Sequence, residues 1–152
     1  MIHHIGWDPP SGRNMTQDIR LLQVQAVGSP RFLPSAPRSG VTSKPGSRLD
    51  YFMKDENGEN VSALTGKILE VVLARKLVHT FSFPRSGDKP SRASYEIEPM
   101  AGSDIVKLTV THDDFEGETE TYKGTSGGWP ILLNSLKSLL ETGQALPTDL
   151  IH

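Results

Sequence analysis

The sequence of 152 residues contains no cysteine, which excludes disulfide bonds, thiol nucleophiles and zinc sites built on cysteine. It also lacks any apolar run of ~20 residues, the length that a membrane-spanning helix needs. Neither sign of charge dominates: the net charge is -2, so nothing in the charge favours a nucleic acid or a membrane surface as partner. The start, MIHHIGWDPP, lacks the basic and apolar regions of a signal peptide, and we expect a cytoplasmic protein.

The composition changes near residue 47. Residues 1–47 hold six of the eleven prolines, and residues 29–47 consist mostly of Pro, Ser, Gly and Arg. Such a segment buries too little apolar surface to offset its ordering entropy. We therefore predict that residues 1–47 are an atypical, mostly loop or disordered segment, with one short strand-like stretch at 22–26. Residues 48–146 are predicted to form the folded domain, and 147–152 a tail.

From residue 48 onward, apolar and polar residues alternate in five segments, as they do in strands with one buried face. The predicted strands cover residues 48–54, 61–72, 76–83, 91–99 and 105–112. Asn57-Gly58 predicts a type I′ turn between the first two strands, and Gly66 predicts a bulge in the second. Because each segment has one apolar face, we expect an antiparallel sheet that is covered on one side.

A single amphipathic helix is predicted over residues 128–142 to cover that sheet. Its apolar stripe recurs at helical spacing and consists of Trp129, Leu132, Leu133, Leu136, Leu139 and Leu140. Thr125 or Ser126 can cap its start, and Pro130 falls in the first predicted turn, where no amide hydrogen is needed. Gly143 is suited to end it in the left-handed conformation.

The stretches KPGSRLDYF, GKILEVVLARKLVHTFSF, SRASYEIEP and KLTVTHDDFEGETETYKGTSGGWPILLNSLKSLLETG follow in consistent order over roughly residues 44–146. The most specific parts are THDDF and the ending GGWP…SLK.LLETG. They resemble bacterial members of the activator of Hsp90 ATPase homologue 1-like family, in the SRPBCC or START/Bet v1-like superfamily. The resemblance implies an α+β helix-grip fold, in which a curved antiparallel sheet packs on a long C-terminal helix around a hydrophobic cavity.

The N-terminal part departs from that family. Relatives begin with a strand and two small helices, whereas residues 15–43 show no such helix pair, so these elements are missing or altered. Two explanations stay open: SGVTS at 39–43 lies in a stretch read in the wrong frame, or the chain has diverged and LLQVQAV is the first strand. Either one leaves apolar sheet surface uncovered, which predicts reduced stability and a homodimer formed through that surface.

The side chains expected to line the cavity belong to the dry faces of the strands and the helix. They are Tyr51, His79, Phe81, Tyr95, Ile97, Leu108, Val110, His112, Trp129, Leu133 and Leu136. His79 and His112 are the candidates for acid/base chemistry or for orienting a ligand. The competing interpretation is a buried histidine bonded to a backbone carbonyl, which the pairing of buried polar groups favours. The aromatic members fit an ordinary core equally well.

Other polar features of the sequence predict neither a cofactor nor a metal. His3-His4 has no third ligand nearby in the sequence, and structural metal sites need three or four. The acidic run from Asp113 to Glu120 is predicted to be a solvated loop. Gly127-Gly128 is predicted to let the helix backbone approach the sheet. No Ser/His/Asp or Cys/His arrangement can be assembled, so no catalytic residue is assigned.

Three functions therefore remain open at the level of sequence. The first is non-enzymatic binding of a small hydrophobic ligand between sheet and helix. The second, implied by the family resemblance, is a co-chaperone that activates an Hsp90-type ATPase. The third is a cyclase- or hydrolase-like enzyme of the superfamily, with His79 or His112 as the base.

Overall fold

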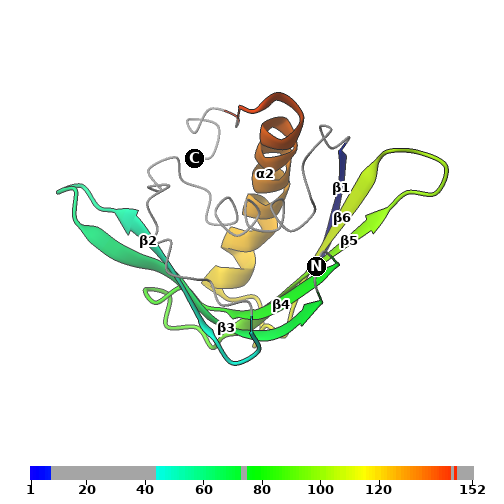
Figure 1. The fold of residues 1–152 in the computed structure, drawn as a ribbon. Helices are drawn as coiled ribbons and strands as arrows, with labels where there is room; N and C mark the ends of the chain where they lie inside the picture. The colour runs from blue at the N-terminus through cyan, green and yellow to red at the C-terminus, as the bar shows by residue number, and fades with distance from the viewer. Residues whose placement is uncertain (8–43, 73–74, 145, 147–152) are drawn as a thin grey trace.

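The computed structural model describes residues 1–7, 44–72, 75–144 and 146, and these form a curved antiparallel sheet with one long helix on its concave side (Figure 1). The strand order is β1-β6-β5-β4-β3-β2. The strands are β1 (Ile2–Trp7), β2 (Arg48–Lys54), β3 (Asn60–Val72), β4 (Lys76–Phe81), β5 (Ser91–Pro99) and β6 (Val106–Asp113), and the helix is α2 (Glu120–Thr142). This is the α+β helix-grip architecture that the sequence predicted.

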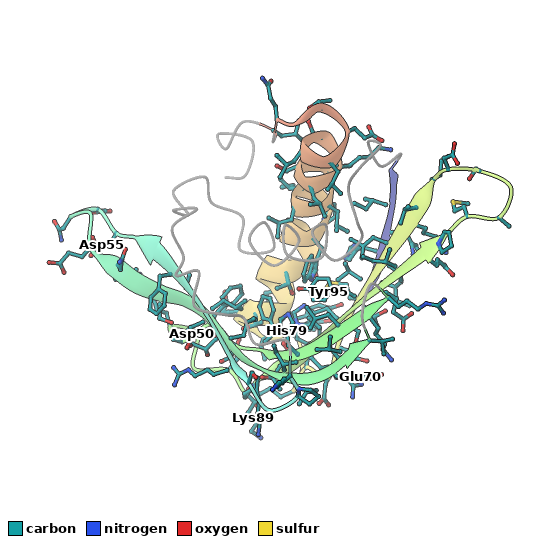
Figure 2. All side chains as sticks on the ribbon, viewed as in Figure 1. Asp50, Asp55, Glu70, His79, Lys89 and Tyr95 are labelled. Atoms are coloured by element: carbon teal, nitrogen blue, oxygen red, sulfur yellow. The ribbon has the colours of Figure 1, made fainter. Side chains whose placement is uncertain are left out.

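The five predicted strands lie at or within two residues of their predicted bounds. The alternation of apolar and polar residues correctly indicated where each strand begins and ends. Along β5 and β6 every second residue is buried, and the residues between them are exposed or half-buried. The buried set faces α2, and salt bridges between neighbouring strands cover the convex side, among them Lys76 to Glu70 and Lys107 to Glu98. Figure 2 shows this division: His79 and Tyr95 lie between the sheet and α2, and Glu70 lies outside.

The first strand of the sheet is β1, which lies within the segment predicted to be mostly loop. It pairs antiparallel with β6, from Ile2 opposite Thr111 to Trp7 opposite Val106. Residues 2–7 therefore supply an edge strand of the sheet. The other candidate for a first strand, LLQVQAV, lies outside the described residues, as do residues 15–43, for which the sequence predicts no helix pair.

Two local predictions were wrong, one for the turn between β2 and β3 and one for β3 itself. Asn57-Gly58 does not form a type I′ turn, because Gly58 alone of the two has a positive φ, and the Asp55 carboxylate accepts the Asn57 and Glu59 amides in a longer loop. The bulge of β3 against β4 falls between Ile68 and Glu70 and not at Gly66. A Cβ at Gly66 would lie 2.0 Å from the Thr80 carbonyl oxygen, so glycine there permits a close approach of two strands.

Helix α2 begins eight residues earlier than predicted, at Glu120. Thr119 is its N-cap and accepts the Tyr122 amide, so neither Thr125 nor Ser126 caps it, and Pro130 lies in the interior instead of the first turn. The predicted end is correct, because Gly143 has φ +80° and donates its amide to Leu139. The glycines before Trp129 do not approach the sheet: a Cβ at Gly127 or Gly128 would meet nothing within 4 Å.

The hydrophobic core lies between α2 and the inner half of the sheet. It joins Ile68 of β3, Tyr95 of β5 and Leu108 of β6 to Leu133 and Leu136 of α2, and none of the five is more than 2 % exposed. In Figure 1 the wing formed by β2 and the start of β3 diverges from α2. No helix among the described residues is long and apolar enough to cross a membrane.

Candidate functional site

Ten of the eleven predicted cavity residues come together between α2 and strands β4, β5 and β6. They are His79, Phe81, Tyr95, Ile97, Leu108, Val110, His112, Trp129, Leu133 and Leu136, and each is at most 4 % exposed. Tyr51 belongs to β2, and its side chain lies outside the part of the structure that is described. Where these ten residues meet, they pack on one another as a core, and their role in binding a ligand stays a prediction.

His112 is the centre of a hydrogen-bond chain through this core. The Trp129 indole Nε1 donates to His112 Nδ1 over 3.0 Å, which links α2 to β6. His112 Nε2 lies 2.7 Å from the Ser91 hydroxyl, and Ser91 donates to the Phe81 carbonyl over 3.2 Å. Because indole nitrogen is only a donor, Nδ1 must be the acceptor, and Nε2 therefore carries the proton and donates it to Ser91.

His79 belongs to a second chain with the opposite tautomer. Its Nδ1 lies 2.7 Å from the Thr80 carbonyl oxygen, which only accepts, so Nδ1 carries the proton. Its Nε2 then accepts from the Tyr95 hydroxyl at 3.2 Å. The structure thus realises the competing interpretation of His79, a buried histidine bonded to a backbone carbonyl.

Both rings are held neutral. Burial, and to a lesser extent the nearby His79, lowers the pKa of His112 to about 3. Burial also lowers the pKa of His79, against the weaker effect of its bond to the Thr80 carbonyl, and burial raises the pKa of the Tyr95 hydroxyl. Protonation of His112 would place its Nδ1–H directly against the indole N–H of Trp129. Geometry and burial therefore both favour the neutral ring.

The Ser91–His112 pair has the distance of a serine nucleophile and its base but the reverse polarity. In a catalytic pair the histidine nitrogen accepts the hydroxyl proton, and an acceptor on the other nitrogen fixes that tautomer. Here the other nitrogen accepts from Trp129, and His112 donates to Ser91. The arrangement is suited to fixing α2 on the sheet, and it leaves neither ring nitrogen free for a substrate.

The remaining charged candidates form hydrogen bonds or ion pairs with other residues of the fold. His4 bonds to Thr109, and no group of three His, Asp or Glu residues in the described ranges lies close enough to hold a metal ion. In the acidic run, Asp113 forms a two-bond ion pair with Arg92, which lowers the pKa of the Asp113 carboxyl. Glu116 pairs with Lys89. The run is therefore partly paired, rather than the wholly solvated loop that was predicted.

A hollow of about 420 Å³ lies beside the core, between β3, the β4–β5 connection and the first turn of α2. Its lining residues are Ser62, Ala63, Phe83, Arg85, Ser86 and Glu120. None of them belongs to the set predicted from the sequence. The sequence gives no signal for this hollow. PRSGDKP is typical of a plain turn, and no pattern indicates that α2 begins early enough to place Glu120 opposite that turn.

The start of α2 is fixed over this hollow by the same connection. Asp88 accepts the Thr121 amide over 2.8 Å and the Thr121 hydroxyl over 2.6 Å. These bonds lower the pKa of the Asp88 carboxyl. The negative charge of Asp88 is also stabilised by the positive end of the helix dipole. A turn between two strands therefore caps the helix from outside, which no local reading of residues 119–125 reveals.

Comparison with known proteins places this geometry in a family. The family described as Activator of Hsp90 ATPase homolog 1-like protein matches residues 30–141. The match begins upstream of the composition change near residue 47. A comparison with curated proteins finds no match.

Solved structures share the fold at low sequence identity. The solution structure of the Aha1 dimer from Colwellia psychrerythraea has a TM-score of 0.61 at 18% identity, over 94% of this chain and 96% of that one. Protein CV1439 from Chromobacterium violaceum has a TM-score of 0.65 at 16% identity, over 93% and 96%. A protein from Arthrobacter aurescens has a TM-score of 0.66 at 15% identity, over 91% and 84%.

The family match and the fold likeness agree with the helix-grip arrangement of sheet and α2. The matched residues span well over half of the sequence and include β2 to β6 and nearly all of α2. The chain therefore belongs to the Activator of Hsp90 ATPase homolog 1-like protein family.

Proposed function

We propose that the protein is a non-enzymatic binding module for a small hydrophobic molecule, which it holds between the sheet and the first turn of α2. The observation that carries this proposal is the hollow of about 420 Å³, whose lining includes the apolar side chains of Ala63 and Phe83. Ligand sites of ~300–1,000 Å³ with mainly apolar walls and a few polar groups are the usual kind. Membership of the family favours a ligand-binding domain.

The hollow is a better ligand site than the core between the sheet and the middle of α2. A ligand among Tyr95, Leu108 and Trp129 would have to displace side chains that are at most 2 % exposed, and well-packed cores resist added volume. Binding in the hollow needs no such rearrangement.

The two alternative functions have less support. The enzyme hypothesis needs a histidine base, and the nitrogens of His79 and His112 are already bonded within the protein. An Hsp90-type partner is drawn from the family description alone, because no described surface of this chain carries an argument for it.

The binding proposal is tested with N-phenyl-1-naphthylamine, an uncharged dye that fluoresces in apolar sites. Wild-type protein is expected to bind the dye saturably, and Ala63→Trp, which fills the hollow, is expected to weaken binding at least about tenfold. Ala101→Trp adds the same ring in the exposed β5–β6 turn and serves as the matched control. Absence of dye binding by the wild type, or equal binding by Ala63→Trp, contradicts the proposal.

We also propose that two copies associate through exposed apolar side chains. Ile2 on the edge strand β1 is 60 % exposed and Phe52 on the edge strand β2 is 50 % exposed. Unpaired edge strands with apolar side chains are common sites of association. The Colwellia relative was solved as a dimer. Light scattering after size exclusion tests this: a monomeric mass up to millimolar concentration contradicts association.

A further inference from the structure

We propose that the molecule bound in the hollow is an amphipathic organic acid, whose apolar part contacts Phe83 and whose carboxylate or sulfonate binds Arg85. This proposal rests on the proposed function, since it specifies the class of ligand that the same hollow takes. It follows from the charges at the hollow, from the side chains left without partners there, and from the position of the aromatic ring.

Arg85 lines the hollow, and its guanidinium forms no ion pair or hydrogen bond with any residue that the structure describes. Its basic neighbours differ in this respect. Lys89 in the same connection pairs with Glu116 at 3.6 Å, and Arg92 at the start of β5 pairs with Asp113 at 2.9 Å. Arg85 therefore offers its full fork of donors, which matches the two oxygens of a carboxylate.

The acidic groups near the hollow have partners other than Arg85. Glu120 lines the hollow but pairs with Lys123 at 3.4 Å. Asp88 accepts two hydrogen bonds from Thr121 at the helix start, where the helix dipole offsets its charge. With these carboxylates engaged, the unpaired charge at the hollow is positive, and the complementary ligand group is an anion.

The rest of the lining supplies both apolar and polar groups. Phe83 packs its ring edge to face with Phe81 of the core, with centroids 4.9 Å apart at 84°, so the core holds the ring in place. Ser86 is already bonded to the Phe83 carbonyl. Ser62 makes no side-chain bond to any described residue and supplies a hydroxyl beside the apolar wall. An apolar body on Phe83 with an acid at Arg85 satisfies both kinds of group.

Two dyes with one skeleton separate this proposal from the proposed function. They are N-phenyl-1-naphthylamine, which is uncharged, and 8-anilinonaphthalene-1-sulfonate, which adds a sulfonate. We expect wild-type protein to bind the sulfonate dye about fivefold more tightly, as an exposed ion pair allows. Arg85→Gln is expected to remove that preference, so that the two dyes bind with about equal affinity, and Arg85→Lys to restore part of it.

Arg75→Gln is the matched control, because it removes an exposed arginine at the opposite end of β4 and should alter neither dye. Thermal melts of each variant check that the fold is retained. Equal affinities for the two dyes, or a preference that persists in Arg85→Gln, overturns the acid-ligand proposal and leaves the binding module standing. Failure of both dyes to bind overturns the two proposals together.

Discussion

The two halves of α2 are built from different kinds of sequence. Residues 131–142, ILLNSLKSLLET, contain five leucines and favour a helix by composition and by pattern. Residues 120–130, ETYKGTSGGWP, contain three glycines and a proline, which are the residues that disfavour a helix interior most strongly. Both halves are nevertheless one continuous helix.

The first half is helical because other parts of the chain hold it. Asp88 binds Thr121 at its start, and His112 binds Trp129 at its end. The Thr125 hydroxyl satisfies the Thr121 carbonyl within the helix. The second half instead relies on burial of its leucines, of which Leu133, Leu136 and Leu140 are at most 2 % exposed. The first half should therefore respond to the loss of single polar contacts, and the second to the loss of volume.

The largest effect is expected from Trp129→Ala. It removes a fully buried ring and the partner that His112 Nδ1 has among the described residues, which should lower the free energy of unfolding by ~3–5 kcal/mol. Leu136→Ala in the second half should cost ~2–4 kcal/mol through volume alone. Urea unfolding of both variants measures the difference. A larger cost for Leu136→Ala would show that the Trp129–His112 contact does not hold the first half.

A pH effect close to that of Leu136→Ala is expected from His112. Its pKa is about 3 in the folded protein and ~6.5 in the unfolded chain, so the unfolded chain binds more protons between these values. The free energy of unfolding should therefore fall as the pH is lowered, by ~2 kcal/mol between pH 6.5 and pH 4.5. Buried His79, whose pKa is also lowered, adds to the fall.

Denaturant unfolding across this pH range tests the effect, with His112→Gln expected to flatten the slope. The exposed His4 on the convex face, whose ring bonds to Thr109, provides the control substitution His4→Gln. The groups whose charges act on His112 are His79, Asp113, the N-terminus and His3. A slope that is the same in His112→Gln and wild type would assign the effect to these groups.

Thr121→Val isolates the tie between the β4–β5 connection and the helix start. Thr121 is 2 % exposed, and the variant keeps its shape while removing the hydroxyl that donates to Asp88. The loss should be ~1 kcal/mol, because the Thr121 amide still binds Asp88. Hydrogen exchange should show faster opening of residues 120–126 and unchanged protection of residues 133–140. Uniform loosening of the whole helix would mean that the halves are not held separately.

The smallest effect is a gain in stability from Gly127→Ala. The added Cβ meets nothing within 4 Å, and alanine favours a helix interior over glycine by ~0.5–1 kcal/mol. The matched substitution Gly143→Ala should be destabilising, because Gly143 has φ +80° at the helix end. Melting temperatures that fall for both variants would indicate that Gly127 has a contact partner that a Cβ displaces.

Much of the fold was predictable because it depends on periodicity. Alternation along residues 91–99 places Ala93, Tyr95 and Ile97 on one face, and pairing with neighbouring strands adds nothing to that assignment. Strand β1 escaped prediction because IHHIGW has no clear alternation, and only its pairing with β6 identifies it. The start of α2 was not predicted, because residues 120–127 have no sequence pattern that is typical of a helix.

The candidate site also has a part that was predictable from the sequence and a part that was not. The sequence by itself determined which side chains face the interior, including His79 and His112, because burial follows the period of the element. Tertiary structure decided the tautomers, since those depend on Trp129, Ser91 and Tyr95 brought together from distant positions. It also decided that Arg85 and Phe83 share a hollow with the first turn of α2, because that meeting depends on where a weak helix begins. Distances between elements are set by packing, and no local pattern of residues encodes them.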